Sequence, residues 1–209
     1  MRILSALAFA LFLGGCATQD STIITRFHDD GRAKPVVVLP SMIDTSCFDV
    51  SWSLSEELTS IIADSLKKGG KIFLQSQEDS TFSANPFAGD FGWMKTEFPD
   101  HEFAVFLELA EHEFASSENS SGEELANNLK MGIRIRVVDL RGGSPKIVLQ
   151  EIVRDSYYIP KTLLPTDYST ITWGSEEYRK SPMGTAHGQI AREVAARVSE
   201  YVLLAKSSY

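Results

Sequence analysis

A predicted strand–helix–strand unit near the start of the chain constrains the fold most. Residues 36–40 (VVVLP) form a continuous, mainly β-branched apolar run, which is typical of a strand buried on both faces. Ser53 and Glu56 have the spacing of a capping box at the start of a helix. Apolar residues then recur at helical spacing: Leu54, Leu58, Ile61, Ile62 and Leu66. Two glycines end this helix and residues 71–75 (KIFLQ) follow as a second strand, so we expect a parallel pair with a right-handed connection.

The rest of the chain predicts three longer strands and a last helix. Residues 102–114 and 146–153 are strand candidates, and between them residues 133–137 (IRIRV) alternate, which predicts one polar and one buried face. The polar residues 115–128 predict a long mobile loop. An apolar stripe indicates a final helix over about residues 185–205. This order predicts an α+β domain with a mixed sheet and helices packed on it.

The first residues of the chain have the pattern of a bacterial export signal. One cation, Arg2, precedes an apolar run over residues 3–13, which is shorter than the roughly 20 residues that cross a bilayer. Gly14 and Gly15 then stand before Cys16, and the sequence LGGC resembles the lipobox of a bacterial lipoprotein precursor. The resemblance implies cleavage before Cys16, a diacylglyceryl group on its sulfur and a fatty acid such as palmitate on its new amine. The alternative is an ordinary secretory signal in which the cysteine occurs by chance.

This pattern divides the chain into three parts. We expect residues 1–15 to be a signal peptide, residues 16–34 the lipidated cysteine and a flexible tether, and residues 35–209 a single α+β periplasmic domain. Two or three acyl chains on Cys16 would hold the protein on a membrane almost permanently. Ala17 stands where aspartate would favour retention in the inner membrane, so we expect the outer membrane, facing the periplasm.

Charge and cysteine content narrow the range of partners. The chain has 20 basic and 28 acidic side chains and a net charge of −8, which argues against nucleic acid and against a polybasic grip on lipid. If Cys16 carries lipid, Cys47 has no partner for an intramolecular disulfide. Because no cation among its neighbours activates the thiol, we interpret Cys47 as small, inert and semi-buried. A reactive thiol or an intermolecular bridge is the alternative.

The sequence contains no familiar catalytic or metal-binding motif. The histidines have no metal-ligand spacing: His28, His101, His112 and His187. Glu111, His112 and Glu113 are expected to form a solvated strand end, with the glutamates on one face and the histidine on the other. No serine-hydrolase elbow, phosphate loop or dinucleotide fingerprint appears. We therefore predict no enzyme, no cofactor and no metal, while an enzyme with catalytic residues from distant parts of the chain stays as an alternative.

Residues 35–75 also carry a family resemblance. Residues 37–40 (VVLP) before the capped helix and residues 67–72 (KKGGKI) after it resemble a family of bacterial envelope lipoproteins. This family shares a fold with the amino-terminal domain of the translocation protein TolB. It includes the curli-secretion lipoprotein CsgG and the penicillin-binding-protein activator LpoB. The resemblance implies the fold and an envelope setting, whereas function must be argued from a site.

An aromatic segment before the last helix is the candidate partner surface. Its rings are Tyr157, Tyr158, Tyr168, Trp173 and Tyr178. Tyrosine and tryptophan are enriched among residues that dominate binding energy, and the alternative is that these rings pack the segment onto the sheet. The predicted function is a lipid-anchored, non-enzymatic binding or scaffold module for another envelope protein or the cell wall. A subunit of an outer-membrane secretion or assembly complex is the alternative.

Overall fold

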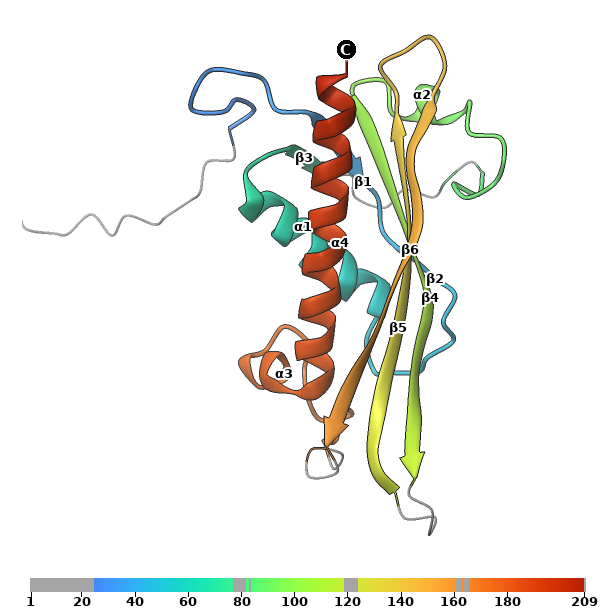
Figure 1. Ribbon diagram of the computed structural model, residues 1–209, viewed down its shortest axis with the longest axis vertical. Helices are drawn as coiled ribbons and strands as arrows, with labels where there is room; N and C mark the ends of the chain where they lie inside the picture. The colour runs from blue at the N-terminus through green and yellow to red at the C-terminus, as the bar shows by residue number, and fades with distance from the viewer. Residues whose placement is uncertain are drawn as a thin grey trace, which may run out of the picture.

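The computed structural model describes residues 25–76, 82, 84–118, 124–160, 163 and 166–208. The predicted signal peptide, Cys16 and the first part of the tether lie outside the described residues. The elements in chain order are β1 (Val36–Leu39), β2 (Ile43–Asp44), α1 (Leu54–Gly69), β3 (Phe73–Ser76), α2 (Met94–Glu97), β4 (Phe103–Glu118), β5 (Glu124–Asp139), β6 (Lys146–Pro160), α3 (Glu176–Lys180) and α4 (Pro182–Ser207) (Figure 1). The described residues form an α+β domain, as predicted.

One mixed sheet of six strands organises the described residues. Its order is β3-β1-β4-β5-β6, and β2 pairs with β4 beside this path. β1 is parallel to β3 on one side and to β4 on the other, with Val37 opposite both Leu74 and Phe103. β4, β5 and β6 are antiparallel neighbours. The parallel pair predicted on either side of the first helix is therefore confirmed.

α1 begins and ends where its local sequence signals predict. Ser53 is the N-cap, and its hydroxyl accepts a hydrogen bond from the Glu56 N–H at 3.2 Å. Gly70 follows the helix with a φ of 64°, a left-handed conformation that glycine adopts without a side-chain clash. Lys67 and Lys68 lie in the last turn, where cations suit the helix dipole. The position of α1 thus follows from its own residues.

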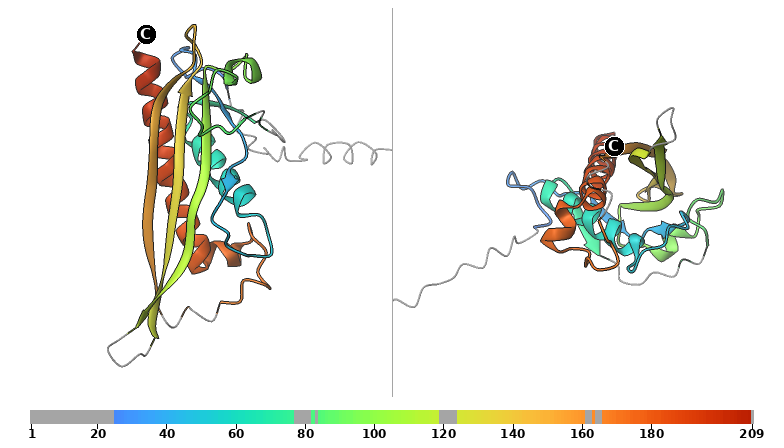
Figure 2. Two further views of the ribbon diagram at one scale, coloured as in Figure 1. Left: turned by 90° about the vertical axis from the view of Figure 1, so that its right-hand side faces the viewer. Right: turned by 90° about the horizontal axis from the view of Figure 1, so that it is seen from below.

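Helices cover one face of the sheet, and a loop segment covers part of the other face. α1 and α4 pack over the first face, where their apolar stripes meet the inward side chains of the strands in the main core (Figure 2). Residues 84–101, which include α2, lie over the opposite face and form a second, smaller apolar cluster around Phe98 and Phe106. The sheet is therefore the middle layer of the domain.

The alternation predicted in β5 is confirmed, but its polar face is partly buried. Ile133 and Ile135 lie in the main core, whereas Arg136 lies on the other face and is only 5% exposed. The Arg136 guanidinium donates hydrogen bonds to the main-chain carbonyls of Pro86 (2.7 Å) and Ala88 (2.8 Å). Arg136 thereby ties the segment of residues 84–101 to the sheet.

The loop predicted over residues 115–128 is wrong, because most of it belongs to a long β-hairpin. β4 continues to Glu118 and β5 begins at Glu124, with Ala115 opposite Asn128. Pairing of the apolar parts of the two strands sets the register, and the polar parts continue it despite their low strand propensity. The hairpin extends beyond α3 and α4 at one end of the molecule (Figure 1).

The interpretation of Cys47 as semi-buried is also wrong. Cys47 is exposed and has a φ of 58°, in the left-handed region that residues other than glycine seldom occupy. The next residue, Phe48, packs against the main core instead. The turn after β2 therefore directs the phenylalanine ring inward and leaves the thiol in solvent.

Candidate functional site

The structure separates the five aromatic residues of the candidate partner surface. Tyr178 is buried in the main core at 2% exposure, whereas Tyr158 is 66% exposed. Tyr157, Tyr168 and Trp173 are partly buried and pack against the main core. The five rings do not share one surface, and partner binding by this segment stays a prediction.

Tyr178 belongs to a buried polar network, which consists of Trp52, Glu57, His112, Tyr178 and His187. The Glu57 carboxylate of α1 lies at its centre and is 0% exposed. Trp52 Nε1 donates to Glu57 Oε2 at 2.7 Å, and His187 Nδ1 of α4 lies 2.8 Å from Glu57 Oε1. The Tyr178 hydroxyl of α3 donates to the same Oε1. One carboxylate thus receives hydrogen bonds from the loop before α1 and from two other helices.

His112 extends this network from the helices to the sheet. Its Nε2 lies 2.8 Å from Nε2 of His187, and its side chain is buried, at 3% exposure. The expectation of a solvated strand end is therefore wrong for His112. A β-bulge between Leu109 and Glu111 shifts the alternation of β4, so that His112 points to the helices. Glu111 lies on the opposite face and pairs with Arg154 at 2.8 Å.

The hydrogen bonds assign protonation states to the network. Burial alone would raise the pKa of Glu57, but the hydrogen bonds from His187, Tyr178 and Trp52 hold it below its usual range. Burial, and after it the Glu57 charge, raise the pKa of Tyr178, so its hydroxyl stays a donor. His187 Nδ1 lies 2.8 Å from both Glu57 Oε1 and the Tyr178 hydroxyl, and its Nε2 shares one hydrogen bond with Nε2 of His112. The other ring nitrogen of His112, Nδ1, is buried without a hydrogen-bond partner in the described part of the chain.

His112 predicts that the protein loses stability in mild acid. Burial, and then the neighbouring His187, lower the pKa of His112 to about 3. The unfolded chain, where histidine titrates near 6.5, binds the proton first, so stability falls as the pH drops below about 6.5. We expect about 2 kcal/mol less free energy of unfolding at pH 5 than at pH 7 from this group. Urea titrations at both pH values measure it, and in His112→Phe the difference should shrink by that amount. An unchanged difference would contradict the assignment.

The sequence contained a signal for this network that motif analysis does not detect. Glu57 lies within the buried stripe of α1, next to Leu58 and one turn after Leu54. His187 lies in the buried stripe of α4, between Met183 and Ile190. Ionisable residues inside an apolar helical stripe indicate a buried pair, because an unpaired buried charge is costly. The sequence does not show which residues pair.

The network is enclosed, and this limits its chemistry. Glu57 and His187 are both 0% exposed, so these ionisable groups have no contact with solvent. Among the described residues, no group of three or more histidine, cysteine, aspartate or glutamate side chains is placed to hold a metal ion. The arrangement joins α1, α3, α4 and β4 through directional hydrogen bonds.

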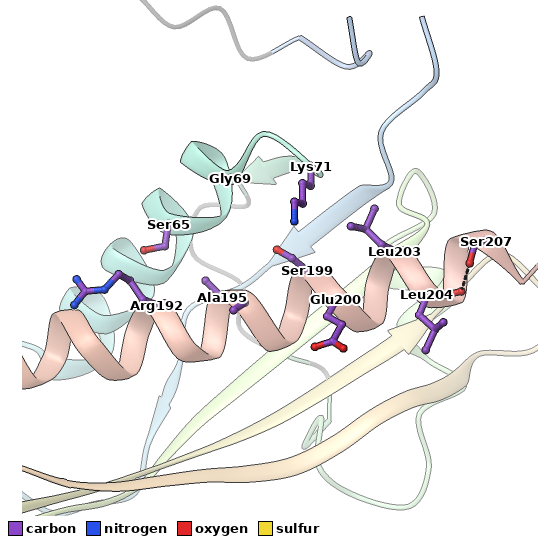
Figure 3. Close-up of a pocket in the computed structure, with 11 residues that line it drawn as sticks. Ser65, Gly69, Lys71, Arg192, Ala195, Ser199, Glu200, Leu203, Leu204 and Ser207 are labelled. Carbon is purple, nitrogen blue, oxygen red and sulfur yellow. Dashed lines mark hydrogen bonds between the residues drawn. The ribbon is translucent and has the colours of Figure 1, made fainter. Parts of the chain in front are cut away.

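The helix groove is a cavity of about 780 Å³ between the end of α1 and the second half of α4 (Figure 3). Its floor is made largely of small residues, such as Ala195 and Ser199. Lys71, Arg192 and Glu200 line it as well, and Figure 3 shows them on different sides of the groove. Side chains of both signs of charge therefore line the helix groove.

The edge groove is a second cavity, of about 500 Å³, beside the last residues of β6. One wall is β6 and the segment after it, and the other is α3 and the first turns of α4. Its lining residues are Asp155, Ser156, Tyr157, Tyr158, Ile159, Pro160, Leu163, Lys180, Pro182, Thr185, Ala186 and Gln189. Leu163 is 49% exposed and Tyr158 66% exposed, so apolar surface faces solvent here. This groove contains two of the five predicted partner residues, Tyr157 and Tyr158.

The described residues define an α+β domain with a helix-covered mixed sheet and an enclosed polar interior. The chain belongs to a family of unknown function, DUF7499, whose model matches residues 24–206. Its structure is similar to that of the hypothetical protein CT253 from Chlamydia trachomatis, with 26% sequence identity and a TM-score of 0.68. The similarity covers 81% of this chain and 98% of that one, so the two share nearly the whole fold.

More distant solved structures include bacterial lipoproteins. The lipoprotein GNA1162 from Neisseria meningitidis has 12% identity and a TM-score of 0.40 over 79% of this chain and 99% of that one. The rare lipoprotein B from Shewanella oneidensis has 14% identity and a TM-score of 0.33 over 83% and 94%. Similarity at this level carries no inference about function. No protein of curated function matches the chain. No helix within the described ranges is long and apolar enough to cross a membrane.

Proposed function

We propose that the protein is a lipid-anchored lipoprotein of the bacterial envelope that binds another envelope protein or the cell wall without catalysing a reaction. In this proposal the lipid on Cys16 sits in the outer membrane and the domain faces the periplasm. The main support for this proposal is that the start of the described chain and the exposed ends of the long strands lie at opposite ends of the domain. The described chain begins, in blue, near the end where α4 finishes, whereas the β4–β5 hairpin and the end of β6 lie toward the opposite end (Figure 1, Figure 2).

The tether length agrees with this orientation. Thr25 lies nine residues after Cys16 (25 minus 16), and an extended chain of that length spans about 30 Å at most. A lipid on Cys16 would therefore keep the first described residues near the bilayer. β4 has 16 residues, a length of about 50 Å for a strand, so the other end would be presented to the periplasm.

Two observations support binding rather than catalysis or membrane insertion. The ionisable side chains of the buried polar network, Glu57, His112, Tyr178 and His187, are each at most 3% exposed. The outer face of the long strands carries exposed cross-strand ion pairs, Glu111–Arg154 at 2.8 Å and Glu113–Lys130 at 3.3 Å, which suit water rather than lipid. These pairs favour the binding module over a subunit that places these strands in a membrane.

Intact mass spectrometry of the protein from separated inner and outer membranes tests the anchor. We expect a mass for residues 16–209 plus acyl chains in the outer-membrane fraction, lost in Cys16→Ala. Cys47→Ala is the matched control and should keep the acyl mass, because an exposed thiol in the folded domain is no substrate for lipidation. An uncleaved or unlipidated wild-type chain would overturn the anchor.

A further inference from the structure

We propose that the free edge of β6 binds an extended, basic peptide segment of a partner protein, which adds a strand to the sheet along residues 155–160. This inference rests on the proposed binding function and specifies how the partner is held. Among the strands that the structure describes, β6 is the last of the sheet and pairs with β5 alone. Its other edge therefore has backbone groups without a strand partner, and such edges are templates for strand addition.

Two observations show which backbone groups of β6 face outward. The Ser156 N–H donates to its neighbour Asp155 Oδ1 at 2.8 Å, which directs this amide away from β5. Pro160 lies four residues after Ser156 in the same strand, so its nitrogen points to the same side of β6. Proline lacks an N–H and is tolerated in a strand where its nitrogen faces away from the ladder. Because backbone direction alternates, Tyr158 also presents its N–H and carbonyl outward, while Tyr157 and Ile159 face β5.

The edge groove has room for the side chains of an added strand. Alternate side chains of such a peptide would enter the groove beside Thr185, Ala186 and Gln189 of α4. The others would lie on the opposite face next to the exposed ring of Tyr158. Backbone hydrogen bonds supply affinity in this mode of recognition, and pockets for alternate side chains supply specificity.

The charges around the edge groove favour a basic segment. Asp155 lines the edge groove beside Tyr157. Burial, then the charge of Asp155 and its hydrogen bond, and then the charge of Glu193 raise the pKa of Tyr157, while Arg192 acts in the opposite direction. Neither carboxylate forms an ion pair with another described residue. Lys180 is already paired with Glu176 at 2.6 Å.

Strand addition would exchange the hydrogen bond between the Ser156 N–H and Asp155 for contacts with the peptide. When the peptide carbonyl accepts the Ser156 N–H, the Asp155 carboxylate is released from that amide. Asp155 can then pair with a lysine or arginine of the peptide. The Ser156 N–H and the Asp155 carboxylate, which bond to each other in the free protein, would thus each gain a partner from the peptide.

Selection of 12-residue peptides displayed on phage, with the full-length protein in detergent as bait, provides the probe. We expect enriched peptides that carry lysine or arginine and that slow hydrogen exchange at the Ser156 and Tyr158 amides. Tyr158→Pro removes an outward N–H and should weaken binding about tenfold or more. Tyr158→Ala keeps that N–H and should weaken binding less. Asp155→Asn should weaken binding several-fold and reduce its salt dependence, whereas Asp29→Asn should not.

Three results would overturn the inference. One is that no peptide is enriched, and another is that enriched peptides protect amides outside residues 155–160. The third is protection of the Ser156 and Tyr158 amides that rises with protein concentration without peptide, together with a dimer mass, which would make a second copy the occupant. If Tyr158→Pro fails to fold, the exchange pattern of the wild-type protein decides alone. If Cys16 is lipidated but no peptide binds along β6, the proposed function stands and the docking surface lies elsewhere. If Cys16 is not lipidated, the proposed anchor is overturned, and the peptide experiment still tests binding at β6.

Discussion

Gly184→Ala should destabilise the protein by more than about 3 kcal/mol, because a side chain at this position has no room. Its Cβ would lie 2.1 Å from the Tyr178 carbonyl oxygen and 2.8 Å from the carbonyl carbon. Both are main-chain atoms, so no change of side-chain rotamer relieves the clash. α3 would have to move away from α4, and Tyr178 would leave the buried polar network with it. The free energy of unfolding, from urea titration followed by circular dichroism, measures the effect.

Gly188→Ala is the matched control, one helical turn further along α4. A Cβ at Gly188 would meet the Arg192 side chain at 3.5 Å, which is ordinary contact with a flexible group. Alanine in a helix interior is favoured over glycine by about 1 kcal/mol, so this variant should be slightly more stable than the wild type. Changes of equal size and sign in the two variants would show that α3 and α4 are not held in close backbone contact.

Glu57→Ala should reduce the free energy of unfolding by about 3–5 kcal/mol, the usual cost of removing one partner from a buried ionic network. Glu57 is 0% exposed and accepts hydrogen bonds from Trp52, Tyr178 and His187. Without the carboxylate, the Trp52 N–H would lose its acceptor, and the Tyr178 hydroxyl and His187 Nδ1, which lie 2.8 Å apart, would be left with only each other at this site. Urea titration at pH 7 measures the loss.

The neighbouring Glu56 provides the comparison for Glu57. The Glu56 side chain is exposed, so Glu56→Ala should change stability by no more than about 1 kcal/mol through the helix dipole. Glu57→Gln keeps one acceptor oxygen but turns an NH2 group toward the donors, so an intermediate loss is expected. If Glu57→Ala were as stable as Glu56→Ala, the network would not contribute to the fold.

The elements that the sequence predicted best are those whose signals are local. The capping box at Ser53, the helical spacing of the apolar residues in α1 and the glycine after it depend only on residues a few positions apart. The continuous apolar run of β1 indicated a strand buried on both faces. The structure confirms it, with Val37 facing the main core and Val38 facing the smaller cluster under α2.

The elements that the sequence missed depend on partners far along the chain. The polar residues 115–118 and 124–128 have weak strand propensity, and only pairing between β4 and β5 holds them extended. The bulge after Leu109 has no signature in the local sequence, yet it turns His112 toward α4. The outward direction of the Ser156 amide likewise follows from which side of β6 is paired.

The sequence by itself determined the α+β class, the parallel unit around α1, the limits of that helix and the resemblance of its start to a lipoprotein precursor. Each of these depends on short-range steric and hydrogen-bonding preferences, or on a contiguous pattern. The tertiary structure decided that Tyr178 is buried while Tyr158 is exposed, that Glu57 joins His187 over 130 positions, and that β6 is the last strand of the sheet among the described residues. These features arise because packing brings distant residues together, and a buried polar group must then find its partners among whichever elements the fold places beside it.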